Sequence, residues 1–260
     1  MASSSSIPDL LADKHDWSSE YNHADCTRYY QGLLKKGQMA ERHEITAKHC
    51  ERFLIPIFKK WAIDLGKPLK FMDMLCCYGN DTLAYTHAYY QEDFEKTWAS
   101  EATCYQLSKP RSFPVETLGV DISEPALEFG KKAGIFDEIL KLDLNALSVS
   151  ESHLLKANCE SANIMHINSS GYINEDVIHQ IIDWFAAGKE PGMIAFALVY
   201  PLEGRERIYR LRTHLLEKFK FMESISMIHR NVTDFERQKF GPEYGIWNRF
   251  SYDLWYMTRF

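Results

Sequence analysis

Long apolar runs are missing from this chain of 260 residues. No stretch of about 18 apolar residues occurs, and the polar opening "MASSSS" has no apolar segment behind a basic start. A helix that spans a bilayer needs such an apolar stretch, and a signal peptide needs an apolar segment after a basic start. We therefore expect neither a membrane span nor a signal peptide, and we expect residues 1–12 to be a flexible tail.

A surplus of positive charge is also missing. The chain has 36 acidic against 30 basic residues, for a net charge of −6. Nucleic-acid-binding proteins usually present a basic face, so we expect no nucleic-acid partner and no membrane partner. Hydrophobic residues make up 45% and charged residues 25%, as in ordinary globular proteins with ample core. Neither number predicts an oligomeric state.

Cysteine pairs with metal-ligand spacing do not occur either. The six cysteines, at positions 26, 50, 76, 77, 104 and 159, include no CxxC pair. In a chain of this size, such a pattern is typical of reduced thiols rather than of disulfides or a zinc site. We therefore expect a cytoplasmic protein without a bound metal.

Strand and helix patterns alternate along most of the chain. Residues 15–63 have helical spacing, which Gly66 and Pro68 end. Strands are predicted at 69–75, 116–121, 138–142, 162–167 and 193–200. Helices are predicted near 80–90, 123–133, 148–157, 173–187 and 204–219. Alternating strands and helices predict parallel strands in a doubly wound α/β sheet.

The C-terminal part has a different pattern. "FMESISMIHR" and "RFSYDLWYMTRF" are both extended, with no helix pattern between them, which favours an antiparallel pair. Residues 91–113 form a long insertion between the first two units. We predict a helical N-terminal lid over 13–66 and an α/β domain over 67–260.

The stretch "MDMLCCYGND", residues 72–81, places an acid inside an apolar strand and then a turn. Only one glycine, Gly79, occupies this turn. A dinucleotide site would need GxGxxG, because a pyrophosphate must approach the backbone closely at a helix N-terminus. Asp81 also stands where a phosphate would lie, so the sequence argues against a dinucleotide-binding oxidoreductase.

Acidic residues lie in or directly after three successive predicted strands: Asp73, Asp121 and Asp143. In an open α/β sheet, ligands bind beyond the carboxyl ends of the strands. Asp121 precedes Ser123 and Pro125, which are typical of a helix start, and its carboxylate can accept from both hydroxyls of a ribose. Asp143 can accept from an adenine amino group. Each acid taken alone is more often a turn former or a helix cap.

This order of motifs resembles class I S-adenosylmethionine-dependent methyltransferases. Asp73 takes the position of the family's first acid, and Gly79 that of the last glycine of its turn. Leu75 and Cys77 stand where glycines are common in the family. The form "DxxCCYG", continued by "GVDIS", is similar to a bacterial and fungal subgroup with a cysteine-rich turn. The resemblance covers roughly residues 65–200.

The resemblance implies a Rossmann-like class I methyltransferase fold with a mostly parallel seven-stranded sheet, an antiparallel C-terminal pair and an N-terminal helical lid. It also implies S-adenosyl-L-methionine as the cofactor. Asp73 would order the turn and, through water, the amino end of the cofactor. Cys76 and Cys77 are more simply read as packing residues than as reactive thiols. The implied cofactor-binding residues are Asp73, Cys76, Cys77, Tyr78, Gly79, Asp121, Ile122, Ser123, Asp143, Leu144, Asn168 and Ser169.

Transfer from a sulfonium cation needs mostly alignment and a dry pocket, and aromatic rings tolerate such a cation well. Tyr30, Asn168 and Tyr172 are the predicted catalytic residues. For Tyr29 and Tyr30, packing in the core of the N-terminal helix is an interpretation that the sequence supports equally well. His166 is predicted to be a core histidine rather than a base. Further pocket candidates are Trp17, Tyr21, His23, Tyr29 and Ser169, with Arg230 and Arg237 as weaker candidates for holding a carboxylate.

Three functions remain open on this evidence. Methyl transfer to a small molecule is favoured. The second is a cyclase that converts S-adenosylmethionine alone into azetidine-2-carboxylate and methylthioadenosine, because bacterial azetidine synthases are similar in size and also look like methyltransferases. The third, a non-catalytic cofactor-binding protein, is favoured least, since the acids and the last glycine remain.

Overall fold

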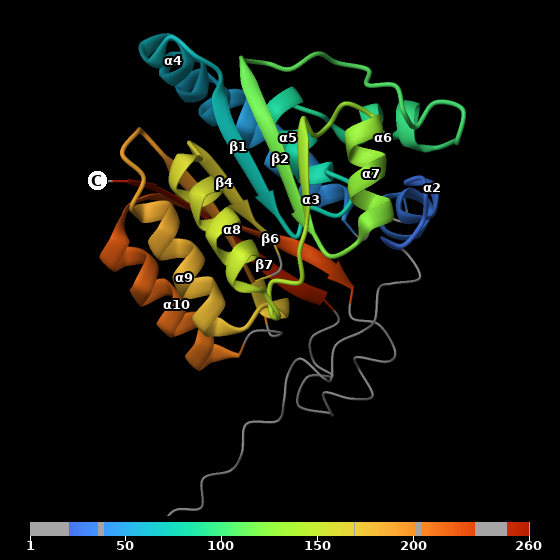
Figure 1. The fold of residues 1–260 in the computed structure, drawn as a ribbon. Helices are drawn as coiled ribbons and strands as arrows, with labels where there is room; N and C mark the ends of the chain where they lie inside the picture. Colours follow the sequence, from blue (N-terminus) through green and yellow to red (C-terminus); the bar gives the residue numbers. More distant parts are fainter. Residues whose placement is uncertain (1–20, 36–38, 169, 201–203, 232–248, 260) are drawn as a thin grey trace, which may run out of the picture.

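A computed structural model describes residues 21–35, 39–168, 170–200, 204–231 and 249–259. Seven strands form one sheet in the order β3-β2-β1-β4-β5-β7-β6 (Figure 1). The first five strands of the chain are parallel, β7 runs antiparallel to β5, and β6 runs antiparallel to β7. The predicted α/β fold class, with its antiparallel C-terminal pair, is therefore confirmed.

The strands lie close to their predicted positions, and β1 begins directly after a left-handed Gly66 ends helix α4. Their bounds are β1 Leu69–Met74, β2 Val115–Asp121, β3 Glu138–Lys141, β4 Ile164–Ile167, β5 Met193–Tyr200, β6 Phe219–Asn231 and β7 Arg249–Arg259.

Helices alternate with the parallel strands as the sequence predicts. Between β1 and β2 the chain forms α5 and then α6, which lies inside the predicted insertion 91–113. The bounds of this part are α5 Asn80–His87, α6 Gln91–Trp98, α7 Glu124–Lys132, α8 Val149–Ser161, α9 Glu175–Ala186 and α10 Arg205–Lys218, with a short 3₁₀ helix η3 at Ser170–Tyr172.

The described N-terminal helices are more broken than the continuous periodicity over 15–63 suggests. Two single π-helical turns interrupt them, and such turns re-aim the side chains that follow. Their bounds are α2 Thr27–Tyr29, η1 Tyr30–Leu34, α3 Ala40–His49, η2 Cys50–Leu54 and α4 Ile55–Leu65.

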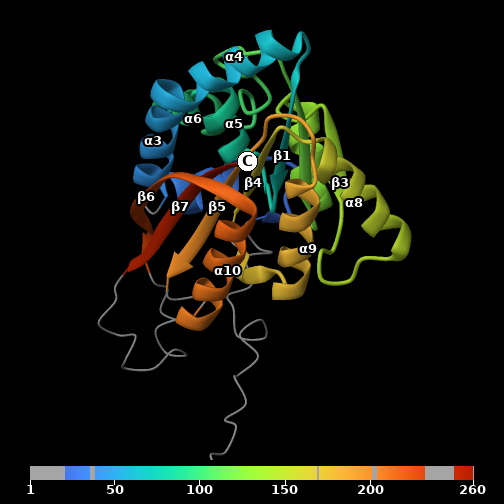
Figure 2. The same ribbon diagram turned by 90° about the vertical axis from the view of Figure 1, so that its left-hand side faces the viewer.

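Helices cover both faces of the sheet, with α3 to α6 on one side and α8 to α10 on the other (Figure 2). Successive residues of β1 point to opposite faces, as the pleat requires. Met72 and Met74 pack with Ile178 of α9, whereas Phe71 packs with Phe58 of α4. A third buried cluster joins the N-terminal helices to α6 and α7, around Tyr29, Tyr78, Trp98 and Phe129.

None of the helices within the described ranges is both long and apolar enough to cross a bilayer.

Candidate functional site

The turn after β1 has positive φ at every second residue from Leu75 to Gly79. Leu75, Cys77 and Gly79 have φ values of 58°, 51° and 84°. A residue with a side chain pays about 1–2 kcal/mol for this conformation. Leu75 and Cys77 therefore adopt a backbone conformation for which glycine is the usual residue.

Neighbouring backbone groups hold this strained turn in place. The N–H groups of Leu75 and Cys76 donate to the Val120 carbonyl at 2.8 and 3.2 Å, and the Gly79 N–H donates to Cys76 O at 2.8 Å. A Cβ on Gly79 would lie 2.6 Å from Ile135 Cγ2. Gly79 is therefore required both by its φ angle and by the space around it.

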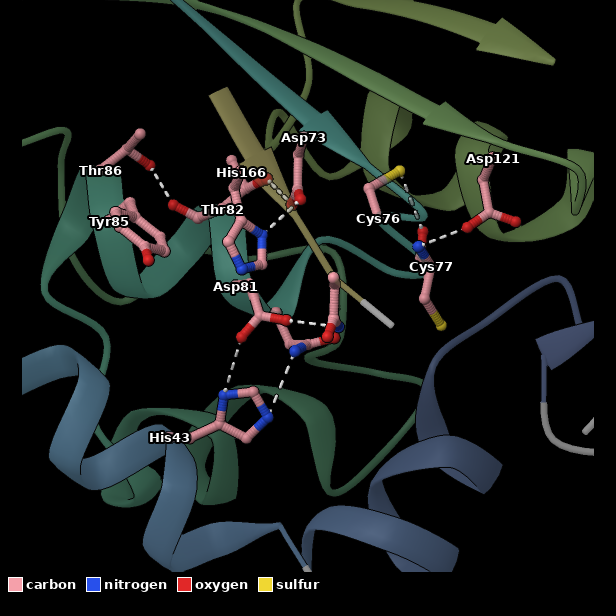
Figure 3. Close-up of polar contacts among 12 residues, drawn as sticks. His43, Asp73, Cys76, Cys77, Asp81, Thr82, Tyr85, Thr86, Asp121 and His166 are labelled. Atoms are coloured by element: carbon pink, nitrogen blue, oxygen red, sulfur yellow. Dashed lines mark hydrogen bonds and ion pairs between the residues drawn. The ribbon is translucent and has the colours of Figure 1, made fainter. Parts of the chain in front are cut away.

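Asp121, at the end of β2, clamps the turn. Its Oδ2 accepts from the Cys77 N–H at 2.8 Å (Figure 3). Its Oδ1 accepts from the Ser123 N–H at 2.9 Å. Burial raises the pKa of Asp121, while these two hydrogen bonds oppose the rise. A carboxylate has about four acceptor positions. Asp121 thus keeps acceptor capacity beyond its two backbone partners.

Three further predicted residues follow the ends of β2 and β3. Ile122 follows the half-buried Asp121, with 60% of its surface exposed. Asp143 is exposed after β3 and accepts from the Asn145 N–H at 3.0 Å, as a turn former does, while Leu144 is buried in the core. Ile122 and Asp143 thus leave one exposed apolar and one exposed carboxylate side chain after two neighbouring strands.

Asp73 points into the protein core. Its Oδ2 accepts from the Thr82 hydroxyl at 2.6 Å, and its Oδ1 lies 2.8 Å from Nδ1 of His166 (Figure 3). Both residues are buried, and the His166 ring packs against Tyr85. The Asp73 carboxylate therefore ties β1 to α5 and β4, and His166 is the core partner that its position inside a strand predicts.

The two adjacent cysteines are held as thiols. Burial raises the pKa of both Cys76 and Cys77 well above the ordinary value, and the nearby Asp121 carboxylate adds to the effect. A thiolate is the form that reacts with electrophiles and binds metals. The geometry thus favours packing for both residues. Within the described residues, no group of three or more His, Cys, Asp or Glu side chains could hold a metal ion.

The N-terminal segment 21–23 lies against the turn and the start of α7. The Tyr78 hydroxyl donates to the carbonyls of Tyr21 and His23 at 3.2 and 3.0 Å and accepts from the His23 N–H at 3.2 Å. The Ser123 hydroxyl donates to Tyr21 O at 2.9 Å. Ser123 also caps α7, as its sequence position predicts. Two predicted cofactor residues, Tyr78 and Ser123, therefore hold the segment that covers them.

A buried polar cluster forms beyond Gly79, on the side of β4. Arg42 of α3 is 1% exposed, and its Nη2 donates to Oδ1 and Oδ2 of Asp81 at 3.2 Å each. Asn168, after β4, donates from Nδ2 to Asp81 Oδ2 at 3.0 Å, and its Oδ1 lies 3.5 Å from Arg42 Nη1. The Arg42 guanidinium lies over the Tyr252 ring at 4.9 Å, and the Tyr252 hydroxyl lies 3.4 Å from Asn168 Oδ1.

Three more side chains complete this cluster. His43 lies with Nε2 3.2 Å from Asn80 Nδ2, and its Nδ1 is 3.6 Å from Asp81 Oδ1 (Figure 3). The Tyr29 hydroxyl donates to Asn80 Oδ1 at 3.0 Å. Arg42, His43, Asn80, Asp81, Asn168, Tyr29 and Tyr252 are called the α3–α5 cluster below.

Burial and charge set the protonation of this cluster. Burial and the Arg42 charge lower the pKa of His43 to about 3, so the ring is neutral at physiological pH. Burial alone would raise the pKa of Asp81, but the charge of Arg42, with smaller effects from His43 and His166, lowers it below the ordinary value. The cluster is therefore a buried ion pair beside a neutral imidazole.

The other predicted catalytic residues occupy different places. Tyr30 is buried in the third core cluster beside α6, whereas its neighbour Tyr29 is the tyrosine whose hydroxyl reaches the α3–α5 cluster. Tyr172 is half-buried in η3, where its carbonyl accepts from Asn145 Nδ2 at 2.9 Å. Trp17, Ser169 and Arg237 lie outside the described residues, as does the side chain of Arg230.

Sequence reasoning missed most of the α3–α5 cluster. In the sequence, Asp81 argues only against a bound phosphate, and no pattern predicts a role for Arg42, His43 or Tyr252. The polar run "ERHE" at 41–44 gives no local sign that Arg42 is buried, because runs of charged residues usually form the exposed face of a helix. Burial of Arg42 follows only from packing α3 onto α5 and β7.

No protein-family model matches the chain, and no curated protein matches it. Some solved structures are similar to the chain. An N-methyltransferase, NodS, from Bradyrhizobium japonicum WM9 is similar at 11% identity and a TM-score of 0.42, covering 81% of this chain and 96% of its own. A 1,6-didemethyltoxoflavin-N1-methyltransferase from Burkholderia thailandensis is similar at 11% identity and a TM-score of 0.45, covering 94% of this chain and 85% of its own.

The [4+2]-cyclase SpnF is a further similar structure, at 11% identity and a TM-score of 0.44, covering 79% of each chain.

Proposed function

We propose that the chain is an S-adenosylmethionine-dependent transferase that methylates a small molecule. The observation that carries this proposal is the left-handed turn at Leu75, Cys77 and Gly79, clamped by the Asp121 carboxylate at 2.8 Å from the Cys77 N–H. The turn lies at the carboxyl end of β1, between β2 and β4, where the sheet order reverses. Open α/β sheets bind their ligands at this switch point.

The residues around the turn fit an adenine nucleoside with a cationic side chain. Asp121 retains acceptor positions for ribose hydroxyls, and the exposed Ile122 offers an apolar surface for a base. Asp143 offers a carboxylate beside it. Asp81 lies in the first turn of α5, where its carboxylate would repel a phosphate group. The site therefore favours a nucleoside over a nucleotide.

When bound, S-adenosylmethionine supplies an electrophilic carbon on a sulfonium, and its transfer needs alignment and exclusion of water more than proton chemistry. Segment 21–23 lies against Tyr78 and Ser123, and α3 contributes the buried Arg42 and His43; both would help to exclude water from a bound cofactor. Neutral His43 adds no positive charge beside a cation. Asn168 places an amide at the end of β4, where it holds the Asp81 carboxylate and would orient a ligand group beside it.

Tyr172 is proposed to face the sulfonium from η3. A ring in this place contributes about 0.5–2 kcal/mol through cation–π attraction. Tyr172→Phe should then retain turnover, and Tyr172→Ala should lose most of it. Equal collapse in both variants would assign the role to the hydroxyl, and full activity in both would remove Tyr172 from the site.

A cyclase that consumes S-adenosylmethionine alone is the second candidate. The observation that favours it is the closed cover: segment 21–23 is hydrogen-bonded to Tyr78 and Ser123, and the buried α3–α5 cluster lies on the side of β4. A self-reacting substrate needs no space for an acceptor. Its α-amine would displace methylthioadenosine from its own γ-carbon, releasing one proton and forming azetidine-2-carboxylate.

The test is incubation with S-adenosylmethionine, first alone and then with a cell-free small-molecule extract, with products identified by mass spectrometry. Methylthioadenosine together with azetidine-2-carboxylate in the first reaction assigns the cyclase. Adenosylhomocysteine that forms only with the extract assigns methyl transfer. Absence of both products, together with no calorimetric binding of adenosylhomocysteine, would contradict the proposed function.

A further inference from the structure

Two buried polar atoms in the α3–α5 cluster lack hydrogen-bond partners among the described residues. They are Nε of Arg42 and Nδ1 of His43. Arg42 is 1% exposed and His43 is fully buried. Proteins rarely leave buried polar groups unpaired, so each such group calls for an explanation. One explanation is a ligand group that pairs with the N–H of Arg42.

The charges of the cluster define what such a ligand must carry. Arg42 offers an unused guanidinium N–H to an anion, but the Asp81 carboxylate lies 3.2 Å from Nη2 of the same guanidinium. The Arg42 charge is therefore already paired, and a simple anion at Arg42 Nε would add an uncompensated negative charge to a buried site that holds the Asp81 carboxylate. A ligand that brings both a carboxylate and an ammonium group satisfies both residues, because its ammonium can take the acceptor capacity that Asp81 retains.

The position of the cluster agrees with this chemistry. Asp121 ends β2, on one side of β1, and Asn168 follows β4, on the other side. The proposed nucleoside groups therefore lie on the β2 side of the turn, and the ion pair lies on the β4 side. An extended ligand that crosses the turn would reach Arg42 with the end opposite its base.

We propose that Arg42 and Asp81 together bind the α-amino-acid headgroup of a ligand, with Arg42 Nε donating to its carboxylate and Asp81 accepting from its ammonium. This inference rests on the proposed function. The headgroup belongs either to the methionine end of S-adenosylmethionine or to a free amino acid that serves as acceptor. Because Arg42 is on α3, the headgroup also ties the N-terminal helices to the sheet.

The experiment compares two ligands by calorimetry. Adenosylhomocysteine carries the amino-acid headgroup, and 5′-methylthioadenosine has the same nucleoside without it. In the wild-type protein, adenosylhomocysteine should bind more tightly. In Arg42→Gln, the affinity for adenosylhomocysteine should fall by about tenfold or more, as expected for lost hydrogen bonds to charged groups, while the affinity for methylthioadenosine stays within about threefold.

Control variants separate recognition from folding. Arg52→Gln changes an exposed arginine of η2 in the same helical region and should leave both affinities unchanged. Arg42→Gln leaves Asp81 buried without its cation and can destabilise the fold. The double variant Arg42→Gln/Asp81→Asn removes both charges and should fold. It should likewise lose the preference for adenosylhomocysteine over methylthioadenosine.

The outcomes distinguish a headgroup of the cofactor from that of a free amino acid. They also distinguish failure of the headgroup assignment from failure of the proposed function. If adenosylhomocysteine keeps its affinity in folded Arg42 variants, saturation-transfer NMR with the common L-amino acids, at saturating adenosylhomocysteine, should show binding that these variants lose. Failure of both measurements would overturn the headgroup assignment and leave Arg42–Asp81 as a structural ion pair. A wild-type protein that binds neither nucleoside would overturn the proposed function, and the inference with it.

Discussion

The Oδ2 atom of Asp121 accepts a hydrogen bond from the backbone N–H of Cys77 at 2.8 Å, across 44 residues of sequence. The bond joins the end of β2 to a turn in which Cys77 has a φ of 51°. One carboxylate thus stabilises a strained backbone and lies next to the edge where a nucleoside would bind. The loss of this carboxylate should therefore affect both stability and binding.

Asp121→Ala should weaken the binding of adenosylhomocysteine by about tenfold or more, because ribose hydroxyls and the Cys77 N–H lose a charged acceptor worth about 1.5–3 kcal/mol. Calorimetry measures the affinity, and circular dichroism checks the fold. Glu124→Gln, at an exposed position at the start of α7, is the matched control. Unchanged affinity in folded Asp121→Ala would show that Asp121 has no role in binding.

Gly79→Ala should be clearly more destabilising than Gly134→Ala. Both glycines have positive φ, at 84° and 74°. A Cβ at position 79 would meet Ile135 Cγ2 at 2.6 Å, whereas nothing lies within 4 Å of a Cβ at position 134. Gly134→Ala should cost about 1–2 kcal/mol of backbone strain, and Gly79→Ala about 1–3 kcal/mol more from overpacking. Equal unfolding free energies in urea for the two variants would contradict the clash.

Acid should destabilise the fold through His43. Its pKa is lowered to about 3 in the folded state, against an ordinary value of about 6.5 when unfolded. Below pH 6.5 the unfolded chain therefore binds a proton that the folded chain does not, and stability falls as the pH falls toward 3. Between pH 7 and pH 5, His43 alone should contribute a loss of ~2 kcal/mol.

His43→Gln should remove that part of the pH dependence of the unfolding free energy. Denaturant titrations at pH 7, 6 and 5 compare this variant with the wild type. His153→Gln, at an exposed position of α8, is the control and should keep the wild-type slope. A His43→Gln slope equal to that of the wild type would mean that the ring is protonated inside the fold.

Tyr78→Phe should loosen the N-terminal segment. The hydroxyl makes three hydrogen bonds to Tyr21 and His23, and its loss should cost about 1 kcal/mol of local stability. Trypsin cleavage after the exposed Arg28 should become several-fold faster, because local opening exposes the backbone. Tyr209→Phe, exposed on α10, is the control. Wild-type cleavage rates in Tyr78→Phe would show that other contacts hold the segment.

The truncation of residues 1–12 is a related prediction from the sequence. It should leave turnover unchanged, whereas removal of 1–35 should abolish it, because Tyr29 and the contacts of segment 21–23 would be lost. Full turnover in the longer truncation would contradict a lid. The division into a lid over 13–66 and a domain over 67–260 stays a prediction.

Periodicity predicted the order and type of the strands and of helices α5 and α7 to α10, because hydrophobic spacing and turn residues act locally. It did not predict α6 or the π-helical turns of the N-terminal helices. The strand ends, the capping role of Ser123 and the antiparallel C-terminal pair follow from such local signals. The need for glycine at position 79 was also readable, since a tight turn before a helix requires positive φ. Asp121 and Asp143 were placed at the edge because parallel strands end together.

Only the tertiary structure decided how the acids are used. Asp73 binds Thr82 and His166, and the latter lies 93 residues away in sequence, so its burial could not be read from the strand. Leu75 and Cys77 take a conformation that their side chains disfavour, because Val120 and Asp121 hold the turn. Arg42 meets Asp81 and Asn168 across 39 and 126 residues. Long-range packing decides such contacts, since their energy depends on burial and partner geometry that no local pattern encodes.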